Sequence, residues 1–207
     1  MTVSEREAQL VSDERPVKER LLESATELMA ERGFAGVSVR EICTAAGTSI
    51  NMLHHYYGSK QGMYDAIIEQ FSDEVFAVPM RLLDTAPKSA DDFVSRMELL
   101  FDATADAYVT NRSVLLVVIR EQASPSALPR YQAALADFIA QAQAAGFVRA
   151  GVDASMVVGF MLDRILNQVQ MAPWITEHYG TDLLTDEDYR RRWTRANLDV
   201  FLHGVVA

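Results

Sequence analysis

Two short helical segments separated by one glycine constrain the fold of this chain more than any other feature. Ser38 and Glu41 form an S-V-R-E capping box, in which each side chain satisfies an unpaired backbone N–H of the other residue at a helix start. Gly47 breaks this helix after about two turns. A new helix begins at Thr48 or Ser49, and two short helices joined by a tight glycine-containing turn are typical of a helix-turn-helix.

The remainder of the chain is expected to be helical throughout. Apolar residues recur at the three- and four-residue spacing of a helix, and no segment of useful length alternates as a half-buried strand does. Besides the two short helices, we expect a helix capped by Ser59 and helices over Pro16–Gly33, Asp91–Thr110, Val114–Glu121, Tyr131–Ala145, Asp153–Met171 and Thr185–His203. The helix from Asp153 is expected to stop before Pro173, because proline cannot donate the backbone hydrogen bond that a helix interior needs.

This pattern predicts an all-α fold of about nine helices. We divide it into a flexible arm at residues 1–16, a three-helix helix-turn-helix domain at 17–60 and a larger helical domain at 61–207. The arm is polar and acidic, which is the opposite of a signal peptide.

Composition limits the cellular setting and the class of protein. Of 207 residues, 49% are hydrophobic, which is enough for a substantial core. No uninterrupted apolar stretch approaches the roughly 18–20 residues of a membrane span, so we expect no membrane partner. Cys43 is the only cysteine, so no intrachain disulfide is possible and a reducing, cytoplasmic location fits.

The net charge of -10 argues against binding to nucleic acid, because DNA affinity depends largely on Lys and Arg that meet phosphates. The acidity is unevenly distributed along the chain. Residues 1–60 carry 7 Lys and Arg against 9 Asp and Glu, a net of -2, whereas the remainder carries 12 against 20. The N-terminal part is therefore near neutral, which weakens the objection.

Three segments of the N-terminal part resemble the DNA-binding domain of the TetR (tetracycline repressor) family. They read L-x-x-x-x-x-x-M-A-E-R-G-F from Leu22 to Phe34, V-S-V-R-E-I-C-T-A-A-G-T-S from Val37 to Ser49, and L-H-H-Y-Y-G-S-K from Leu53 to Lys60. The order, spacing and turn chemistry agree over residues 17–71, whereas the rest of the chain matches the family only in being helical and of suitable length. The resemblance implies double-stranded DNA as a partner.

A recognition helix exposes its N-terminal residues to base edges and packs its other face inward. We expect Leu53 and Tyr57 to point inward, and Asn51 to be the best candidate for a hydrogen bond to adenine. Ile50 and Met52 can contact thymine methyl groups. The full set of predicted DNA-contacting residues is Ser38, Arg40, Thr48, Ser49, Ile50, Asn51, Met52, His54, His55, Tyr56 and Lys60, with Ser38, Arg40, Tyr56 and Lys60 as phosphate contacts.

The recognition helix departs from the pattern of the family that it resembles. Family members usually have Lys at the position of Ile50, Gly or Pro at Asn51, Thr or Ser at Met52, and Tyr at His54. Three of these changes remove a phosphate partner, so we infer weaker nonspecific affinity or an unusual operator preference.

The larger domain carries a stripe of aromatic and methionine side chains that includes Phe93. One interpretation is plain core packing, and the other is an apolar pocket for a largely apolar small-molecule effector. The candidate effector-binding residues are Met97, Phe101, Tyr108, Arg120, Met161 and Arg164. For each arginine, an ion pair or a solvated edge is an equally good interpretation.

The last two expected helices have a larger apolar face than one small bundle needs. The resemblance implies that this pair forms a four-helix interface in a homodimer. The candidate interface residues are Val157, Phe160, Trp193, Leu198 and Phe201. Two recognition helices in a dimer read half-sites about 34–36 Å apart, whereas a single short helix reads too few base pairs.

The resemblance implies a repressor that a small-molecule ligand releases from a palindromic operator. Two other functions remain: a helical protein-interaction module that has lost DNA binding, and a helical enzyme. We expect no enzyme and no cofactor, because no nucleophile elbow, phosphate loop or paired-carboxylate motif is present. We expect no metal site, because adjacent His54 and His55 point about 100° apart on a helix. Cys43 is interpreted as an inert core thiol rather than a redox sensor.

Overall fold

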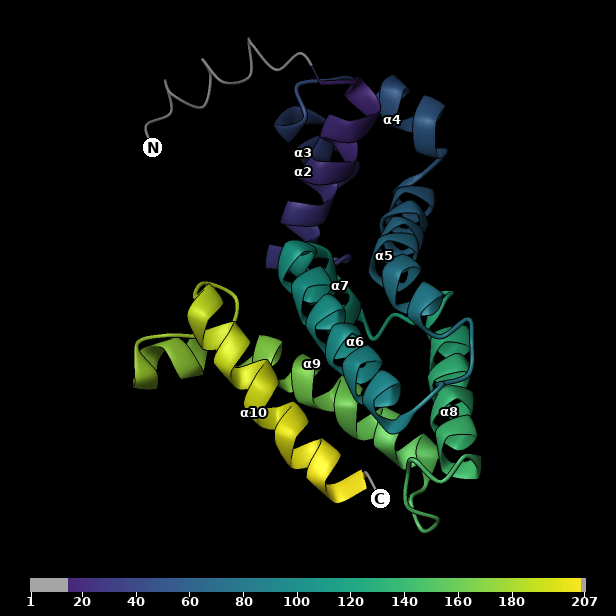
Figure 1. Ribbon diagram of the computed structural model, residues 1–207. Helices are drawn as coiled ribbons and strands as arrows, with labels where there is room; N and C mark the ends of the chain where they lie inside the picture. The colour runs from purple at the N-terminus through teal and green to yellow at the C-terminus, as the bar shows by residue number, and fades with distance from the viewer. Residues whose placement is uncertain (1–14, 206–207) are drawn as a thin grey trace. The chain divides into compact units, whose positions relative to one another are not determined.

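The computed structural model describes residues 15–205, and the all-α prediction is confirmed within them (Figure 1). This part contains nine helices and no strand. In chain order they are α2 (Val17–Arg32), α3 (Val39–Ala45), α4 (Ile50–Tyr57), α5 (Lys60–Leu82), α6 (Ala90–Thr110), α7 (Arg112–Glu121), α8 (Leu128–Ala144), α9 (Ala154–Tyr179) and α10 (Glu187–Val205). The arm predicted at 1–16 lies outside the described residues, apart from its last two. None of the described helices has both the length and the apolar composition needed to cross a membrane.

The described residues form two compact units. The smaller unit contains the chain as far as Phe71 together with a second segment, Ser113–Pro125. The larger unit contains Ser72–Arg112 and the chain from Ser126 onward. Compared with the predicted division at residue 60, the smaller unit also includes the first half of α5 and most of α7. The chain thus passes between the units three times.

The smaller unit is built around the inward face of α2. Leu21, Ala25 and Met29 follow one another at four-residue spacing and are fully buried. They share one core with Ile42 of α3 and Leu53 of α4. Buried residues of α5 (Met63, Ile67 and Ile68) and of α7 (Val117) complete this core. The helix-turn-helix is therefore packed on two further helices and is not an isolated motif.

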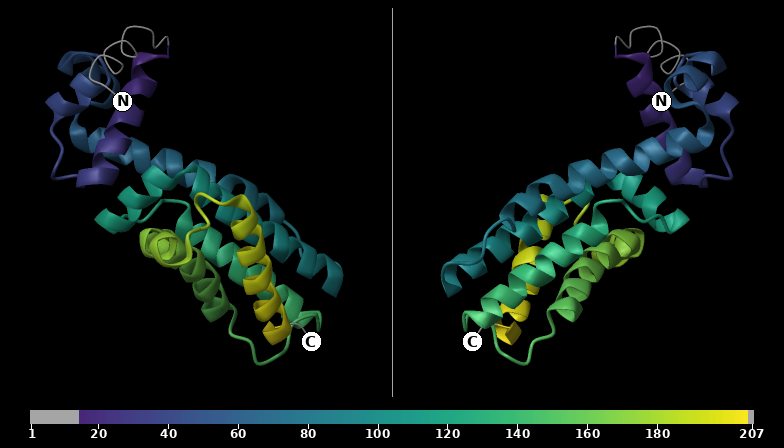
Figure 2. Two further views of the ribbon diagram at one scale, coloured as in Figure 1. Left: turned by 90° about the vertical axis from the view of Figure 1, so that its left-hand side faces the viewer. Right: turned by 90° about the vertical axis from the view of Figure 1, so that its right-hand side faces the viewer.

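The larger unit is a bundle in which α8 packs along α9 and α10 packs along α6 (Figure 2). The predicted stripe on α6 is buried in its interior, including Phe93, Met97, Phe101 and Tyr108. Phe93 stacks on Phe138 of α8 with ring centroids 5.6 Å apart. Packing in the bundle interior thus accounts for the stripe without any ligand.

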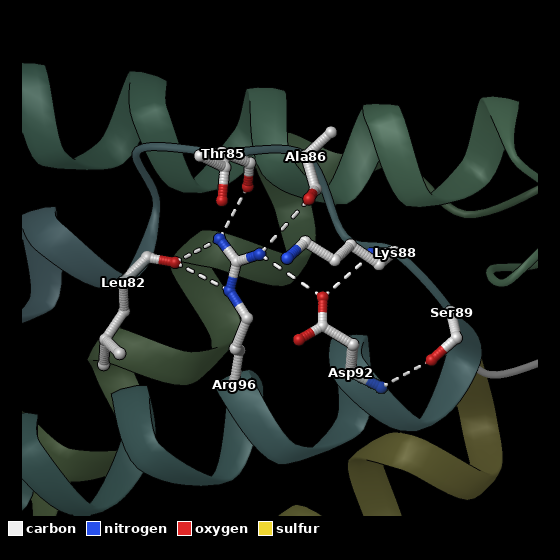
Figure 3. Close-up of polar contacts among 7 residues, drawn as sticks. All are labelled: Leu82, Thr85, Ala86, Lys88, Ser89, Asp92 and Arg96. Atoms are coloured by element: carbon white, nitrogen blue, oxygen red, sulfur yellow. Dashed lines mark hydrogen bonds and ion pairs between the residues drawn. The ribbon is translucent and has the colours of Figure 1, made fainter.

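A single arginine joins α6 to the end of α5 in the larger unit (Figure 3). Arg96 donates hydrogen bonds to the carbonyl oxygens of Leu82, Thr85 and Ala86, with distances of 2.9, 2.6 and 3.3 Å. Its guanidinium also lies 3.5 Å from a carboxylate oxygen of Asp92. The last carbonyls of α5 have no partner within that helix, and Arg96 supplies one. This side chain therefore holds the C-terminal end of α5 in place.

The prediction that the helix from Asp153 stops before Pro173 is wrong. Helix α9 continues through Pro173 to Tyr179 and ends at Gly180, which has a left-handed backbone. Ala172 and Ile175, on either side of the proline, are buried. Proline inside a helix costs about 3 kcal/mol, and burial of side chains such as Ile175 offsets that cost by about 1.5–3 kcal/mol each. The packing of the last two turns therefore overrides the local signal.

Candidate functional site

The predicted capping box at the start of α3 is confirmed. The Glu41 N–H donates to Ser38 Oγ at 3.2 Å, and the Ser38 N–H donates to Glu41 Oε2 at 2.8 Å. The Ser38 hydroxyl also donates to this carboxylate at 2.6 Å, and Arg32 donates to its other oxygen at 2.7 Å. The hydrogen bond from Ser38 is the main reason that the pKa of Glu41 is lowered to about 2. Glu41 is therefore a carboxylate throughout the physiological range.

This arrangement bears directly on the phosphate contact predicted at Ser38. Its hydroxyl and its backbone N–H are both committed to Glu41, whose negative charge lies beside the same helix end. A phosphate approaching this helix start would therefore meet a carboxylate. Arg40, the second residue of α3, is exposed.

The recognition helix α4 has one face anchored in the smaller unit. Leu53 is 0% exposed, and the Tyr57 hydroxyl donates to the carbonyl oxygen of Lys18 on α2 at 2.8 Å. These are the two residues predicted to point inward. Because this face is held, the opposite face is presented outward in a defined orientation.

The outward face of α4 contains most of the predicted DNA-contacting residues. Ser49, Ile50, Asn51, His54, His55 and Tyr56 are exposed. Thr48 is half-buried, and Met52 is half-buried because it packs against the core of the smaller unit. The exposed set combines an amide, two imidazoles, a phenol and an apolar side chain, which are groups that read base edges and bind phosphates.

The two histidines on this face make different contacts. His54 forms a hydrogen bond through Nδ1 with the carbonyl oxygen of Gly58 at 2.8 Å, which occupies a carbonyl at the end of α4. His55 makes an edge-to-face contact with Tyr56, with ring centroids 5.0 Å apart. Within residues 15–203, no three His, Cys, Asp or Glu side chains gather as a metal site.

Two basic side chains near the recognition helix bind backbone carbonyls of the smaller unit. Lys60 donates to the carbonyl oxygen of Phe34, and its ammonium lies 4.2 Å from the centre of the Phe34 ring. Arg20 donates to the carbonyl oxygen of Ala46 at 3.1 Å. The sequence pattern did not indicate these partners, which lie 26 residues away along the chain. The predicted phosphate contact of Lys60 thus competes with an internal one.

Comparison with known proteins agrees with this geometry. Residues 21–67 match the model of the family described as bacterial regulatory proteins, tetR family. The transcriptional repressor KstR2 of Mycolicibacterium smegmatis is 26% identical over 157 residues, which are 70% of this chain and 74% of the relative. These matches support a TetR-family transcriptional regulator. Members of this family are DNA-binding transcription regulators, and they usually act as dimers that respond to small molecules.

Two solved structures share the fold of this chain. The ketosteroid transcriptional regulator KstR2 of Mycobacterium tuberculosis aligns with a TM-score of 0.70 and 22% identity, over 93% of this chain and 96% of that one. The TetR-family regulator PfmR of Thermus thermophilus aligns with a TM-score of 0.69 and 20% identity, over 91% and 96%. The similarity covers both units of the chain, including the part in which no motif was found.

The six predicted effector-binding residues fall into two groups in the structure. Met97, Phe101, Tyr108 and Met161 are buried in the interior of the larger unit. Arg120 belongs to the smaller unit, where it donates to the carbonyl oxygen of Glu31 at 2.9 Å. Arg164 is exposed, donates to Asn197 Oδ1 at 2.9 Å and lies over the Trp193 ring. The four apolar and aromatic candidates thus lie in the interior of the larger unit, whereas neither arginine lies there.

Sequence reasoning missed the other polar groups in the interior of the larger unit. Thr104 and Tyr131 are buried and hydrogen-bonded to each other, and burial raises the pKa of both Tyr131 and Tyr108. The Oε1 atom of Gln168 on α9 is buried and has no hydrogen-bond partner in the structure. Gln168 follows Met161 and Ile165 at helical spacing on the inward stripe of α9, and this spacing was the signal that could have identified it.

A charged groove of about 710 Å³ lies between α6 and α10. Its charged lining includes Glu98, Asp102 and Asp106 of α6 and Arg190, Arg191 and Arg195 of α10. Arg190 and Asp106 form an ion pair at 2.9 Å across it. None of the six predicted effector-binding residues lines this groove, whose charged side chains are accompanied by apolar ones such as Leu198 and Leu202.

The predicted dimer-interface residues also divide into two groups. Phe160 is exposed on α9 and Val157 is half-buried. Leu198 and Phe201 are buried, and Trp193 stacks on Phe101 at 5.8 Å, so these three contribute to packing within the larger unit. The large apolar and aromatic side chains that are exposed on the described part of the last two helices are Met156, Phe160, Met171, Trp174, Tyr179 and Val200.

Proposed function

We propose that this TetR-family regulator is a homodimeric, cytoplasmic repressor that a small-molecule effector releases from a palindromic operator. The observation that carries the proposal is the exposed face of α4. The opposite face of this helix is anchored in the smaller unit by Leu53 and Tyr57. Asn51 lies in the first turn of that helix and is exposed. The similarity to KstR2, a transcriptional repressor, supports repression as the mode of action.

The DNA contact is proposed to run along the outer face of α4 and its flanks. Ser49, Ile50, Asn51, His54, His55 and Tyr56 face the groove, with Thr48 and Arg40 at the edge. Ser38, Met52 and Lys60 contribute less, because each already has contacts within the smaller unit. With Arg40 as the exposed cation of the predicted set, base contacts supply a larger share of the affinity than phosphate contacts do.

The effector is proposed to bind in the interior of the larger unit. Met97, Phe101, Tyr108 and Met161 supply an apolar and aromatic wall, and the unpartnered Oε1 atom of Gln168 can accept one hydrogen bond. An effector that suits these groups is largely apolar and carries a hydrogen-bond donor. Arg120 and Arg164 are left out of this site, because their guanidinium groups already bind Glu31 and Asn197.

The dimer is proposed to form through the exposed face of α9. Met156, Phe160, Met171 and Trp174 lie on that face at spacings of four, eleven and three residues, which keep them on one side of a helix. Their exposed fractions are 73, 47, 39 and 45%. An apolar face of this size is typical of an association surface, and a second copy of the chain covers it. Replacing Phe160 by glutamate is expected to yield a monomer in sedimentation experiments.

The proposal is tested by selecting operator DNA from a library of randomised duplexes with the purified wild-type protein. The Asn51→Ala variant is expected to bind the selected duplex about 10- to 100-fold more weakly, because one good bidentate contact to a base contributes about 1–3 kcal/mol. The Gln132→Ala variant, altered at an exposed amide of α8, serves as the control and keeps wild-type affinity. Failure of the wild-type protein to enrich any duplex at low salt would refute DNA binding.

A further inference from the structure

We propose that Lys18 is a second phosphate anchor of the smaller unit, which binds one strand of the duplex while Arg40 binds the other. The inference rests on the proposed function and adds to it a residue that the sequence pattern did not indicate. All the residues that carry it belong to the smaller unit.

Most basic side chains of the smaller unit are engaged within it. Its described residues include seven lysines and arginines, six in 15–71 and one in 113–125. Five of them bind a carboxylate or a backbone carbonyl, namely Arg15, Arg20, Arg32, Lys60 and Arg120. Among the described residues, the Lys18 ammonium and the Arg40 guanidinium have no hydrogen-bond or ion-pair partner. These two cations therefore have a charge that is left for DNA phosphates.

The sequence around Lys18 explains why its charge is unpaired. Side chains three and four residues apart are neighbours on a helix, and those that follow Lys18 at this spacing are the apolar Leu21 and Leu22. Arg40 likewise has no acidic residue three or four positions further along the chain. Both basic residues are exposed, so their charged groups are presented to solvent.

A hydrogen bond to Tyr57 places Lys18 at the end of the recognition helix. Tyr57 is the last residue of α4, and its hydroxyl donates to the Lys18 carbonyl oxygen at 2.8 Å. Burial raises the pKa of Tyr57 to about 12, so the hydroxyl keeps its proton and stays a donor. The start of α2 accordingly lies beside α4 (Figure 1). The backbone of Lys18 is thus fixed next to the C-terminal end of α4.

The length of α4 matches the width of the groove that it is proposed to enter. Its eight residues rise by about 12 Å, and the major groove of B-DNA is about 12 Å wide. The two ends of α4 therefore reach toward the two rims of the groove, which the phosphates of the two strands form. In a helix-turn-helix the first helix crosses the DNA backbone, which brings Arg40 of α3 to one rim. Lys18, beside the C-terminal end of α4, stands at the opposite rim.

Each of the two cations is followed by a glutamate, Glu19 after Lys18 and Glu41 after Arg40. Adjacent residues of a helix point about 100° apart, so neither carboxylate shares the direction of its basic neighbour. The Glu41 carboxylate is also held back by the hydrogen bond from the Ser38 hydroxyl. A phosphate can therefore approach each cation from one side only, which orients the smaller unit on the duplex.

The experiment removes phosphate charges one at a time. The probe is the palindromic duplex selected by the wild-type protein, together with versions in which one phosphate of each half-site is replaced by an uncharged methylphosphonate. At one position, this replacement is expected to weaken wild-type binding about tenfold. The same replacement leaves the binding of Lys18→Gln unchanged, because that variant lacks the cation that the phosphate binds. The position coupled to Arg40 in the Arg40→Gln variant is expected on the other strand of the half-site.

Three comparisons make the result specific to Lys18. Lys18→Gln keeps the backbone carbonyl that Tyr57 binds, so the frame of α4 is retained. Lys18→Arg retains a cation and is expected to keep the coupling. Lys88→Gln removes the same charge from an exposed lysine of the larger unit and is expected to bind every duplex as the wild-type protein does.

The salt dependence of binding gives a second readout. Each phosphate contact contributes about 0.9 to the slope of log affinity against log salt concentration, and a dimer makes two contacts through Lys18. The slope of Lys18→Gln is therefore expected to be smaller in magnitude by about 1.8. The slope of Lys88→Gln is expected to equal that of the wild-type protein.

Two results overturn the inference. In one, the wild-type protein selects a duplex, but no methylphosphonate position distinguishes Lys18→Gln from the wild-type protein. In the other, the phosphates coupled to Lys18 and to Arg40 lie on the same strand. Selection of no duplex by the wild-type protein refutes the proposed function itself, so the two failures are distinguishable.

Discussion

The two units of this protein differ in how far along the chain their decisive polar contacts reach. In the smaller unit, the start of α3 is specified by Ser38 and Glu41, which are three residues apart. In the larger unit, Arg164 binds Asn197 from 33 residues away, and Arg190 binds Asp106 from 84 residues away. Helix starts that depend on neighbours are readable in the sequence, whereas side-chain partners on other helices are not.

The smaller unit also depends on contacts between residues that are far apart in the sequence. Phe34 and Glu121 are 87 residues apart, and Glu31 and Arg120 are 89 apart. These contacts join the end of α2 to the end of α7. The comparison thus separates a locally specified helix-turn-helix motif from its tertiary support.

The largest expected effect tests the distant contacts of the larger unit. The Arg96 side chain is only 13% exposed. Replacing it by methionine leaves the carbonyl oxygens of Leu82, Thr85 and Ala86 without their donor. We expect the free energy of unfolding to fall by about 3 kcal/mol. Tryptophan fluorescence during urea unfolding measures this effect, because both tryptophans, Trp174 and Trp193, lie in the larger unit.

The matched control for Arg96 is Arg81→Met, altered at an exposed arginine of α5. Exposed substitutions usually change stability by about 0.5 kcal/mol or less. Equal shifts of the fluorescence midpoint in the two variants would show that the hydrogen bonds of Arg96 make no specific contribution to stability.

A smaller effect is expected at the locally specified start of α3. Replacing Ser38 by alanine removes the hydroxyl that accepts the Glu41 N–H. Loss of such a helix cap costs about 1 kcal/mol. Hydrogen exchange of the α3 amides is expected to accelerate, whereas the exchange of α6 stays unchanged. The Ser95→Ala variant, altered at an exposed position inside α6, should not destabilise its helix.

The next effect has the opposite sign. Replacing Gln122 by glycine relieves a backbone at φ 51, and helices commonly end on a glycine in this conformation. Glycine loses more conformational entropy on folding than glutamine does, and this loss offsets part of the gain. We therefore expect the free energy of unfolding to rise by about 0.5 kcal/mol. In thermal unfolding, Gln132→Gly, at an exposed position inside α8, should instead destabilise. Destabilisation by Gln122→Gly would indicate a side-chain role that outweighs the strain.

The smallest expected effect is the pH dependence of the capping box at the start of α3. The pKa of Glu41 is about 2 in the folded protein against an ordinary value of 4.5, so its ionised form stabilises the fold. This contribution is complete above pH 4.5 and is lost as the pH falls toward 2. The difference in stability between the wild-type protein and Glu41→Gln should therefore shrink over that interval. A constant difference from about pH 6 to about pH 2 would contradict the capping-box account.

Much of the fold followed from short-range patterns. The all-α class, the capping box, the inward positions of Leu53 and Tyr57, and the buried stripe on α6 are confirmed. The DNA-contacting and effector-binding residues stay predictions. The end of α9 was wrong because the local cost of Pro173 was given more weight than the burial of Ile175, which depends on neighbours that the pattern does not show.

The sequence by itself determined where helices begin, which face of each is apolar and which three helices make the recognition motif, because capping, glycine breaks and helical spacing act between residues a few positions apart. Only the tertiary structure decided that Lys60 and Arg120 bind backbone carbonyls, that Leu198 and Phe201 turn inward and that Trp174 stays exposed. The physical reason is that a long polar side chain, or one edge of an apolar face, has several partners within reach. Packing against distant segments selects one of them.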